Sequence, residues 1–255
     1  MILTLDIGNT NVKAALFDGP KVCHYWRLST DIRATSDEYG IRLISMFANK
    51  GFAAEQVDGV VISSVVPSIN FTIDHMVRNY FGQSPLFVSD KLQMGIDFSR
   101  VQHTELGTDL MADAVGAYDE YGGPCIAVDF GTATTFSVVD ENAVFLGGCI
   151  CPGVKLSAEA LVTGTAKLPR FEIARPDKVI GTTTVSYLQS GVFFGYVGLV
   201  RNIVRKFKME LGREAVVVAT GGIASVLSDE CKVIDRLDTL LTLKGLRLIY
   251  ERNRK

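Results

Sequence analysis

Residues 3–18 read LTLDIGNTNVKAALFD, and residues 126–140 follow the same plan as IAVDFGTATTFSVVD. In each stretch an apolar run ends in an aspartate, Asp6 or Asp129, and a glycine with small polar residues separates it from a second apolar run. Apolar runs of this length joined through glycine predict the two strands of a β-hairpin. Two such hairpins in one chain indicate a duplicated fold.

The turn of each hairpin has the composition of a phosphate-binding loop. Gly8 and Gly131 let the backbone approach a ligand closely, and nearby hydroxyl, amide and backbone N–H groups can donate hydrogen bonds to phosphate oxygens. An aspartate at the strand end supplies an oxygen ligand for Mg²⁺, which commonly takes only one or two carboxylates when phosphates provide other ligands. A single copy would be ordinary turn chemistry, whereas the duplication favours two turns that grip one nucleotide.

The composition is that of a globular protein with an even charge balance. The chain has 255 residues, 47% of them hydrophobic, with 26 Lys and Arg against 28 Asp and Glu and a formal charge of −2. The absence of a basic tract argues against nucleic acid as the primary partner. The N-terminus has no basic leader and no apolar run approaches the roughly 20 residues of a membrane helix, so we expect a cytoplasmic protein without membrane association.

The five cysteines are odd in number and lie mostly in apolar runs, which predicts buried reduced thiols and no disulfide framework. Cys149 and Cys151 form a C-x-C pair that could bind a soft metal. However, no second cysteine pair is present and the three histidines are scattered, so core packing is the favoured interpretation.

A β-meander followed by alternating helices and strands predicts an α/β fold with a mixed sheet in each half. We place the two halves at residues 1–118 and 119–255, the second with a mainly helical insertion over residues 152–211. Beyond the hairpins, predicted strands cover residues 22–30, 59–66, 85–88, 144–150 and 214–220, and predicted helices cover residues 37–50, 71–81, 108–121, 156–161, 187–207 and 240–252.

Duplicated meanders with D-x-G-x-T turns, followed by a later strand ending in T-G-G, resemble the sugar kinase, Hsp70 and actin superfamily. The resemblance implies two duplicated ribonuclease H-like (actin-like ATPase) domains, each a mixed five-stranded sheet flanked by helices, with a nucleotide cleft between them. It also implies that residues 6–13 meet Mg²⁺ and the outer phosphates, that residues 131–135 support the phosphates, and that residues 220–223 meet the adenosine.

Six motifs are more specific and resemble type III pantothenate kinase. They are DIGNTNVK (6–13), SSVVPSIN (63–70), GTD opening a helix (107–109), DFGTATT (129–135), LGGCICPG (146–153) and TVSYLQSG (184–191). The resemblance implies ATP-dependent phosphorylation of pantothenate to phosphopantothenate, the first step of coenzyme A biosynthesis, by a homodimer.

The family resemblance assigns roles residue by residue. Asp109 would orient or deprotonate the attacking hydroxyl group, Asp6 would hold Mg²⁺, and Asp129 would hold a monovalent cation, K⁺ or NH₄⁺. The residues implied to contact ATP are Asp6, Ile7, Gly8, Asn9, Thr10, Asn11, Val12, Lys13, Thr132, Gly221 and Gly222; those implied to contact pantothenate are Arg100, Gly107, Thr108, Asp109, Leu110 and, from the second subunit, Thr184.

Asp109 also has a structural interpretation. It precedes a predicted helix, so it could be an N-terminal cap or a first-turn acid favoured by the helix dipole. Asp113, one turn later, is the alternative base if Asp109 points away.

The sequence departs from the family pattern at the acceptor site. Where the family has G-x-D-R, residues 107–110 read GTDL, and residues 102–103 read QH in place of Asn-Pro. A charge-assisted hydrogen bond contributes roughly 1.5 to 3 kcal/mol, so losing the arginine predicts about ten- to hundredfold weaker carboxylate binding. Either Arg100 replaces the missing guanidinium, or the protein phosphorylates another small hydroxylated molecule or has become a nucleotide-binding regulator; Arg100 could also be a solvated loop residue.

The helical insertion is apolar on more than one helical face, which is typical of a central core helix or of an interface. With the family resemblance, this favours a homodimer. The apolar residues are Leu188, Val192, Phe193, Phe194, Tyr196, Val197 and Leu199.

Overall fold

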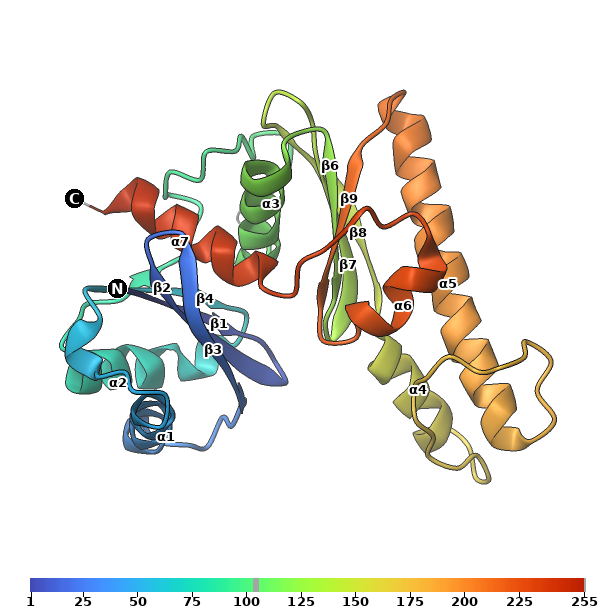
Figure 1. The fold of residues 1–255 in the computed structure, drawn as a ribbon, viewed down its shortest axis with the longest axis horizontal. Coiled ribbons are helices and arrows are strands. Elements are labelled where there is room, and N and C mark those ends of the chain that lie inside the picture. The colour runs from blue at the N-terminus through green and yellow to red at the C-terminus, as the bar shows by residue number, and fades with distance from the viewer. Residues whose placement is uncertain (103–105, 255) are drawn as a thin grey trace. The chain divides into compact units, whose positions relative to one another are not determined.

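The computed structural model describes residues 1–102 and 106–254. The chain divides into two compact units, and Figure 1 shows their helices and strands. The first unit comprises Met1–Ile96, Gln102–Gly116 and Leu241–Lys255, and the second comprises Asp97–Val101 and Ala117–Leu240. Each is built on its own sheet.

The first sheet has five strands in the order β3-β2-β1-β4-β5. Strands β1, β2 and β3 form an antiparallel meander, and β4 and β5 continue the sheet parallel to β1. This mixed pattern follows from the sequence, because tight turns join the first three strands and longer connections lead into β4 and β5. The bounds are β1 Ile2–Ile7, β2 Asn11–Asp18, β3 Lys21–Ser29, β4 Gly59–Ser64 and β5 Leu86–Phe87.

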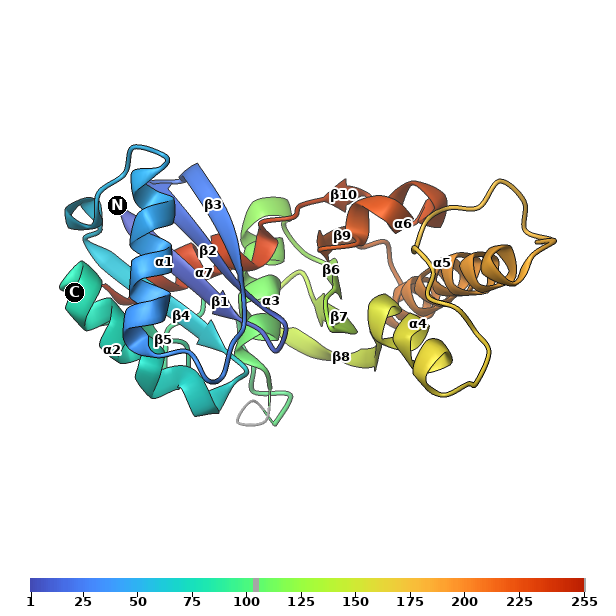
Figure 2. The same cartoon turned by 90° about the horizontal axis from the view of Figure 1, so that it is seen from below.

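Helices cover both faces of the first sheet. Helices α1 (Ser36–Ala48) and α2 (Asn70–Phe81) pack on one face, and the short 3₁₀ helices Ala54–Gln56 and Pro67–Ile69 precede β4 and α2. Helix α7 (Leu241–Asn253) contacts β1, β2 and β4 from the other side, with α3 (Thr108–Tyr121) beside it. The views of Figures 1 and 2 agree on these layers.

The second sheet repeats the first, with the order β10-β9-β6-β7-β8. Strands β6, β7 and β8 form the antiparallel meander, and β9 and β10 run parallel to β6. The duplicated fold with two mixed five-stranded sheets is therefore confirmed. The bounds are β6 Cys125–Phe130, β7 Ala133–Val139, β8 Phe145–Pro152, β9 Val216–Gly221 and β10 Arg236–Leu237.

One long helix forms most of the cover of the second sheet. Helix α5 (Thr184–Leu211) buries Phe193, Val197 and Val200 in the same core as strand residues of β6, β7 and β9. Helices α4 (Val154–Thr163) and α6 (Ala224–Cys231) pack against α5, as Figure 2 shows. Among the described residues, every helix is too short or too polar to serve as a membrane span.

The predicted helical insertion is only partly right. Residues 164–183, between α4 and α5, have no regular secondary structure. Pro169 and Pro176 fall in this segment, and proline both lacks an N–H donor and disfavours helix in the residue before it. Helix α6 and strand β10 are short and were not predicted from the sequence.

The C-terminal helix packs in a different unit from the one we expected. Residues 241–255 were assigned to the second half, but α7 belongs to the first unit. Its buried face, which includes Leu243, Leu246 and Ile249, faces the first sheet. Gly245 allows this packing, because a Cβ there would lie 1.9 Å from the Ala112 carbonyl oxygen of α3.

Candidate functional site

The turn between β1 and β2 is fixed by its own backbone and by Thr30, just after β3. The Gly8 amide donates to the Asn11 carbonyl at 3.0 Å, and the Thr30 hydroxyl donates to the Gly8 carbonyl at 2.6 Å. The Thr30 amide donates to the Thr10 carbonyl at 3.0 Å. Asn9 and Thr10 form the exposed tip. The tip therefore offers polar groups to a ligand from a fixed backbone.

Asp6 and Lys13 form an ion pair at the base of this turn. They stand opposite each other in the β1–β2 register, and the Lys13 Nζ lies 3.1 Å from the Asp6 Oδ2. Asp6 is only 5% exposed, so water screens its charge weakly. The next register pair, Ile7 and Val12, lies in the hydrophobic core, so only the backbone of these two predicted site residues is available to a ligand.

Asp109 lies in the first turn of α3 within electrostatic range of this pair. Burial, and then the negative charge of Asp6, raise the pKa of the Asp109 carboxyl group above its ordinary value. Hydrogen bonds from the backbone and the Lys13 cation oppose this shift without cancelling it. A carboxylate with a raised pKa is a better proton acceptor near neutral pH than an ordinary aspartate.

Thr108 attaches the start of α3 to the end of β4. Its Oγ1 lies 3.0 Å from the Ser63 Oγ, accepts a hydrogen bond from the Ser64 amide at 3.1 Å, and lies 3.3 Å from the Ser64 carbonyl oxygen. Ser63 is in turn the register partner of Asp6 in the β1–β4 pair. This link therefore positions Asp109 against the strand ends. The motif beginning at Ser63 indicated the family, but nothing in the sequence alone indicated this role.

Asp113, the alternative base, has a structural role. It is 2% exposed, and its Oδ1 accepts a hydrogen bond from the Thr242 hydroxyl at 2.6 Å. Its carboxylate holds α3 against α7, which leaves Asp109 as the candidate base.

Four of the six residues predicted to contact the acceptor, Gly107 to Leu110, lie together at the start of α3. A Cβ at Gly107 would lie 2.4 Å from the Asp109 Oδ1, so glycine leaves room for that carboxylate. The Leu110 amide donates to the same oxygen at 2.9 Å. The backbone therefore fixes the Asp109 side chain whichever residue occupies position 110.

Arg100 and Thr184 belong to the second unit, whereas Asp109 belongs to the first. Arg100 is exposed. The pKa of Asp97 is lowered mainly by hydrogen bonds from Ser99 and, to a smaller extent, by the positive charge of Arg100. Thr184 is the exposed first residue of α5, after the capping residue Thr183. Residue 103, part of the altered acceptor loop, lies outside the described residues.

The second turn joins β6 to β7 and packs closely against two glycines. A Cβ at Gly221, whose φ is +97°, would lie 2.4 Å from the Asp129 Oδ1. A Cβ at Gly153 would lie 2.0 Å from the Thr132 carbonyl oxygen. These distances exclude a side chain at either glycine unless the backbone moves. The structure therefore brings Asp129, Thr132 and Gly221 together within the second unit.

A cavity of about 500 Å³ lies beside the end of β9. Gly222 and Ile223 line one side, and Phe171 and Ile173 of the irregular segment line another. Gly222 was predicted from the sequence to contact the nucleotide, whereas the segment 170–173 was not, because only the tertiary fold places that segment beside Gly222.

The cysteines agree with core packing. All five are free thiols. Burial raises the pKa of Cys125 to about 12, and it is the largest cause of the rise in the pKa values of Cys149 and Cys231 to about 11. In the described part of the chain no three His, Cys, Asp or Glu side chains cluster as a metal site would require.

Comparison with known proteins identifies relatives over the whole chain. Residues 2–206 match the profile of the family described as type III pantothenate kinase. A protein of Brevibacillus brevis named type III pantothenate kinase is 48% identical over 99% of both chains. A protein of the same name from an Exiguobacterium strain is 46% identical over 100% of both.

Solved structures share the fold at much lower identity. A Campylobacter jejuni protein, provisionally described as a transcriptional activator of the Baf family, superposes with a TM-score of 0.62 at 20% identity over 98% of both chains. A Sinorhizobium meliloti protein, provisionally described as a 2-dehydro-3-deoxygalactonokinase, gives 0.61 at 10% identity, over 98% of this chain and 96% of its own. At these identities the likeness concerns the fold alone.

Proposed function

Since this chain belongs to the type III pantothenate kinase family, we propose that it transfers the terminal phosphoryl group of ATP to the hydroxyl group of pantothenate, the first step towards coenzyme A. The observation that carries this proposal is the placement of Asp109, a carboxylate with a raised pKa, beside the Asp6–Lys13 ion pair. The other hypotheses, a different acceptor or a non-catalytic regulator, are not favoured, because both named relatives align over essentially the full chain.

Asp109 acts on the acceptor. The pantothenate hydroxyl oxygen bonds to the terminal phosphorus, the bond from that phosphorus to the bridging oxygen breaks to release ADP, and the hydroxyl proton passes to Asp109. Phosphoryl transfer mainly requires alignment and charge stabilisation, so the links that hold Asp109 through Thr108 and the Leu110 amide are part of the proposal.

The residues of the first turn fit an Mg²⁺ ion that is shared with the nucleotide. Asp6 is one nearly buried carboxylate at a strand end, and Mg²⁺ with phosphates commonly takes one or two protein carboxylates. When bound, the ion would neutralise charge on the phosphate oxygens. Lys13 would bind the same oxygens as a point charge, and the turn tip at Asn9 and Thr10 would donate hydrogen bonds.

The residues of the second turn fit a hard monovalent cation and the rest of the nucleotide. Asp129 and the carbonyls of residues 131 and 132 supply oxygen donors only, the ligand type that hard cations take. We propose that Thr132 and Gly221 meet the phosphates. The cavity beside Gly222, with the Phe171 ring in its wall, would take the adenosine.

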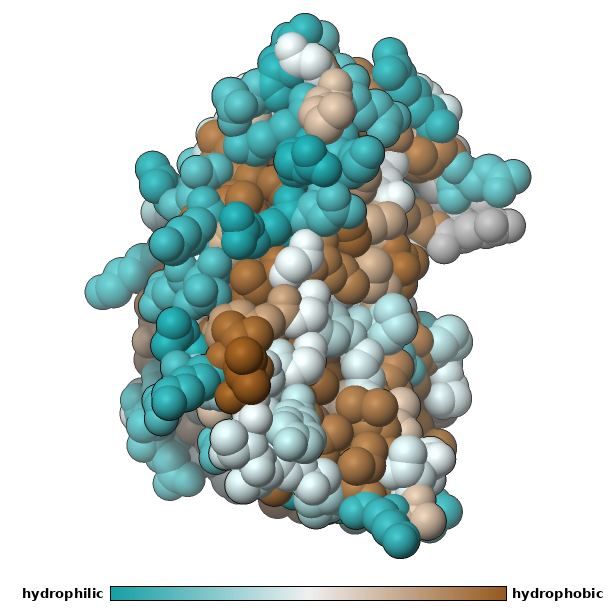
Figure 3. Space-filling model, turned by 90° about the vertical axis from the view of Figure 1, so that its right-hand side faces the viewer, coloured by the Kyte–Doolittle hydropathy of each residue, from teal (hydrophilic) through white to brown (hydrophobic). Residues whose placement is uncertain are grey.

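A homodimer is also part of the proposal. The described residues around α4 and the start of α5 include the exposed apolar side chains Leu156, Ile180, Val185 and Tyr187. The face drawn in Figure 3 shows apolar patches between polar side chains. If Thr184 of one subunit completes the acceptor pocket of the other, folded monomers would be inactive. A cytoplasmic location stays a prediction.

A coupled ADP-release assay tests the activity. Purified protein with ATP, Mg²⁺ and K⁺ should form ADP only when pantothenate is added, and Asp109→Asn should remove this dependence. ADP formation that is the same without pantothenate, or none in its presence, would contradict the proposal. Arg100→Ala tests the acceptor site separately, because an unchanged KM for pantothenate would show that Arg100 does not serve its carboxylate.

A further inference from the structure

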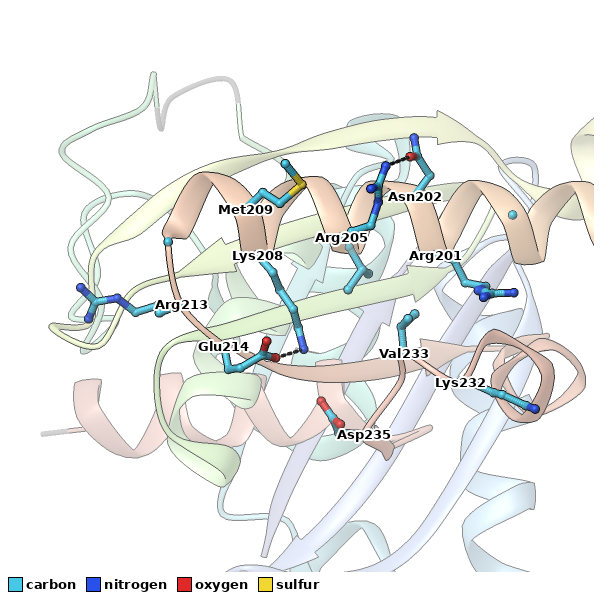
Figure 4. A pocket seen from close by; sticks show the side chains of 13 residues that line it. Arg201, Asn202, Arg205, Lys208, Met209, Arg213, Glu214, Lys232, Val233 and Asp235 are labelled. Atoms are coloured by element: carbon cyan, nitrogen blue, oxygen red, sulfur yellow. Dashed lines mark hydrogen bonds and ion pairs between the residues drawn. The ribbon is translucent and has the colours of Figure 1, made fainter.

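A second pocket of the second unit is separate from the turns discussed above. It has a volume of about 970 Å³ and lies between the C-terminal half of α5, the loop before β9 and the segment after α6 (Figure 4). Its lining includes five basic side chains: Arg201, Arg205, Lys208, Arg213 and Lys232. The whole chain carries a formal charge of −2, so this concentration of positive charge runs against the overall balance.

Part of this charge is neutralised by ion pairs with neighbouring carboxylates. The Lys208 Nζ lies 2.6 Å from the Glu214 Oε2, and Arg213 pairs with Glu141. Asp235, the other acid in the lining, accepts a hydrogen bond from the Val217 amide at 2.8 Å and so helps to hold the loop after α6.

Three cations remain without such a partner. Arg201, Arg205 and Lys232 form no ion pair with a carboxylate in the part of the chain that the structure describes. The contact of Arg205 within the pocket is a long one to the Asn202 amide oxygen, at 3.4 Å. All three side chains are exposed, so an incoming anion can reach them.

The arrangement of these cations suits a ligand with several anionic groups. Arg201, Arg205 and Lys208 are four and three residues apart, which puts them on one face of α5. Lys232, just after α6, lines the same pocket from another segment. Gly198 has open space where a side chain would stand, and Val233 adds apolar surface.

We propose that this pocket binds a small polyanion with at least two phosphate groups. The planar guanidinium fork matches the geometry of phosphate oxygens, and the volume exceeds what one phosphate would fill. The cations line a single pocket and come from α5, the loop before β9 and the segment after α6, so they do not form one continuous stripe that could follow a nucleic-acid backbone.

This site is different from the nucleotide turn. Glu214, in the pocket lining, precedes β9, whereas Gly221 and Gly222 stand at the other end of the same strand. Six residues of β-strand span roughly 20 Å, so one small ligand does not reach both ends. The inference therefore does not depend on the proposed kinase activity.

Calorimetric titration with pyrophosphate tests the inference. EDTA in the buffer removes the divalent ions that phosphate binding at the first turn would use. The double variant Arg201→Ala/Arg205→Ala should bind at least about tenfold more weakly than the wild type, because charge-assisted hydrogen bonds to the anion are lost. Lys206→Ala is the matched control: it removes one positive charge from the same helix outside the pocket lining and should leave the affinity unchanged.

Lys13→Met separates the two sites. It should retain pyrophosphate binding under these conditions, and the double variant should retain wild-type kinase activity and thermal unfolding. Binding that survives in the double variant, binding lost only in Lys13→Met, or no binding to the wild type would overturn the inference. Tighter binding of a single-stranded oligonucleotide than of pyrophosphate would overturn its assignment to a small ligand.

Discussion

The two hairpins have the same register plan but different charges at the base of the turn. In the first, Asp6 stands opposite Lys13; in the second, Asp129 stands opposite the neutral Thr135. The first turn thus carries its own cation beside a buried carboxylate, whereas a glycine, Gly221, closes against the carboxylate of the second. The same hairpin therefore carries an ion pair, Asp6–Lys13, in the first copy and a close contact between Gly221 and the Asp129 carboxylate in the second.

The helices that follow the two sheets differ in the same way. Helix α3 comes after β5 and begins with Thr108 and Asp109, whereas α7 comes after β10 and begins with Leu241 and Thr242. Only the first copy therefore places a carboxylate in this helical turn. We infer that the first copy performs the chemistry and that the second mainly holds the nucleotide.

Removing the Asp109 carboxylate should have the largest effect, and it tests whether the first copy performs the chemistry. Asp109→Asn should lower kcat by about 10²- to 10⁴-fold, the usual contribution of a general base, with little change in the KM for ATP. The amide also relieves the cost of burying a charge near Asp6, so the variant should unfold at a higher temperature than the wild type. Steady-state kinetics and thermal unfolding measure the two effects.

Asp113→Asn is the matched control for this prediction. It changes a carboxylate to an amide one turn further along α3, at the residue that accepts from Thr242. We expect it to destabilise the protein by roughly 1 to 3 kcal/mol and to leave kcat nearly unchanged. If Asp113→Asn abolished turnover and Asp109→Asn did not, the assignment of the base would be reversed.

Gly221→Ala should have the next largest effect, on stability and nucleotide affinity. Its Cβ would lie 2.4 Å from the Asp129 Oδ1 and 2.7 Å from the Phe130 backbone, at a φ that L-residues rarely adopt. Backbone strain and overpacking together should lower the free energy of unfolding by about 3 kcal/mol and raise the KM for ATP. Urea unfolding and kinetics measure both.

The first copy supplies the control, because Ser64 stands on β4 where Gly221 stands on β9. The Ser64 hydroxyl donates a hydrogen bond to the Asn70 Oδ1 and accepts one from the Val66 amide, and Ser64→Ala loses both. This should cost only about 1 to 2 kcal/mol of stability. Equal losses in Gly221→Ala and Ser64→Ala would show that the close approach at Gly221 has no special importance.

Lys13→Met tests the charge that distinguishes the first turn. It removes the cation of the Asp6 pair, and kcat/KM for ATP should fall by about 10- to 100-fold through the lost charge-assisted contact. The Lys13 charge lowers the pKa of Asp109, so its removal should raise that pKa further. The base acts when deprotonated, so the acidic limb of the kcat/KM profile should move to higher pH in the variant. An acidic limb that moved to lower pH would contradict this placement of Lys13.

The local parts of this comparison could be predicted from the sequence. Each hairpin is formed by residues within about ten positions of its glycine, and the helix predicted over residues 108–121 is confirmed with the same bounds. The equivalence of the two meanders is likewise confirmed by the matching strand orders.

The parts that depend on distant residues could not be predicted. Asp109 and Asp113 are both plausible bases in the sequence, and the partner that commits Asp113 to packing is Thr242, 129 residues away. The same applies to α7, whose apolar face could cover either sheet until the fold selects one. Periodicity gives the buried face of a helix but not the sheet that buries it.

The smallest expected effect concerns the junction that positions Asp109. Thr108→Val keeps the volume of the side chain but removes the hydroxyl that meets Ser63 and Ser64, so we expect a loss of about 1 to 2 kcal/mol of stability and a modest fall in kcat. Thr108→Ser retains the hydroxyl and should restore kcat. The Thr242 hydroxyl donates to Asp113, which is not the candidate base, so Thr242→Val should affect stability without affecting kcat. If Thr242→Val lowered kcat as much as Thr108→Val, then general helix packing would account for both effects, and the catalytic difference between the two copies would rest on Asp109 and Lys13 alone.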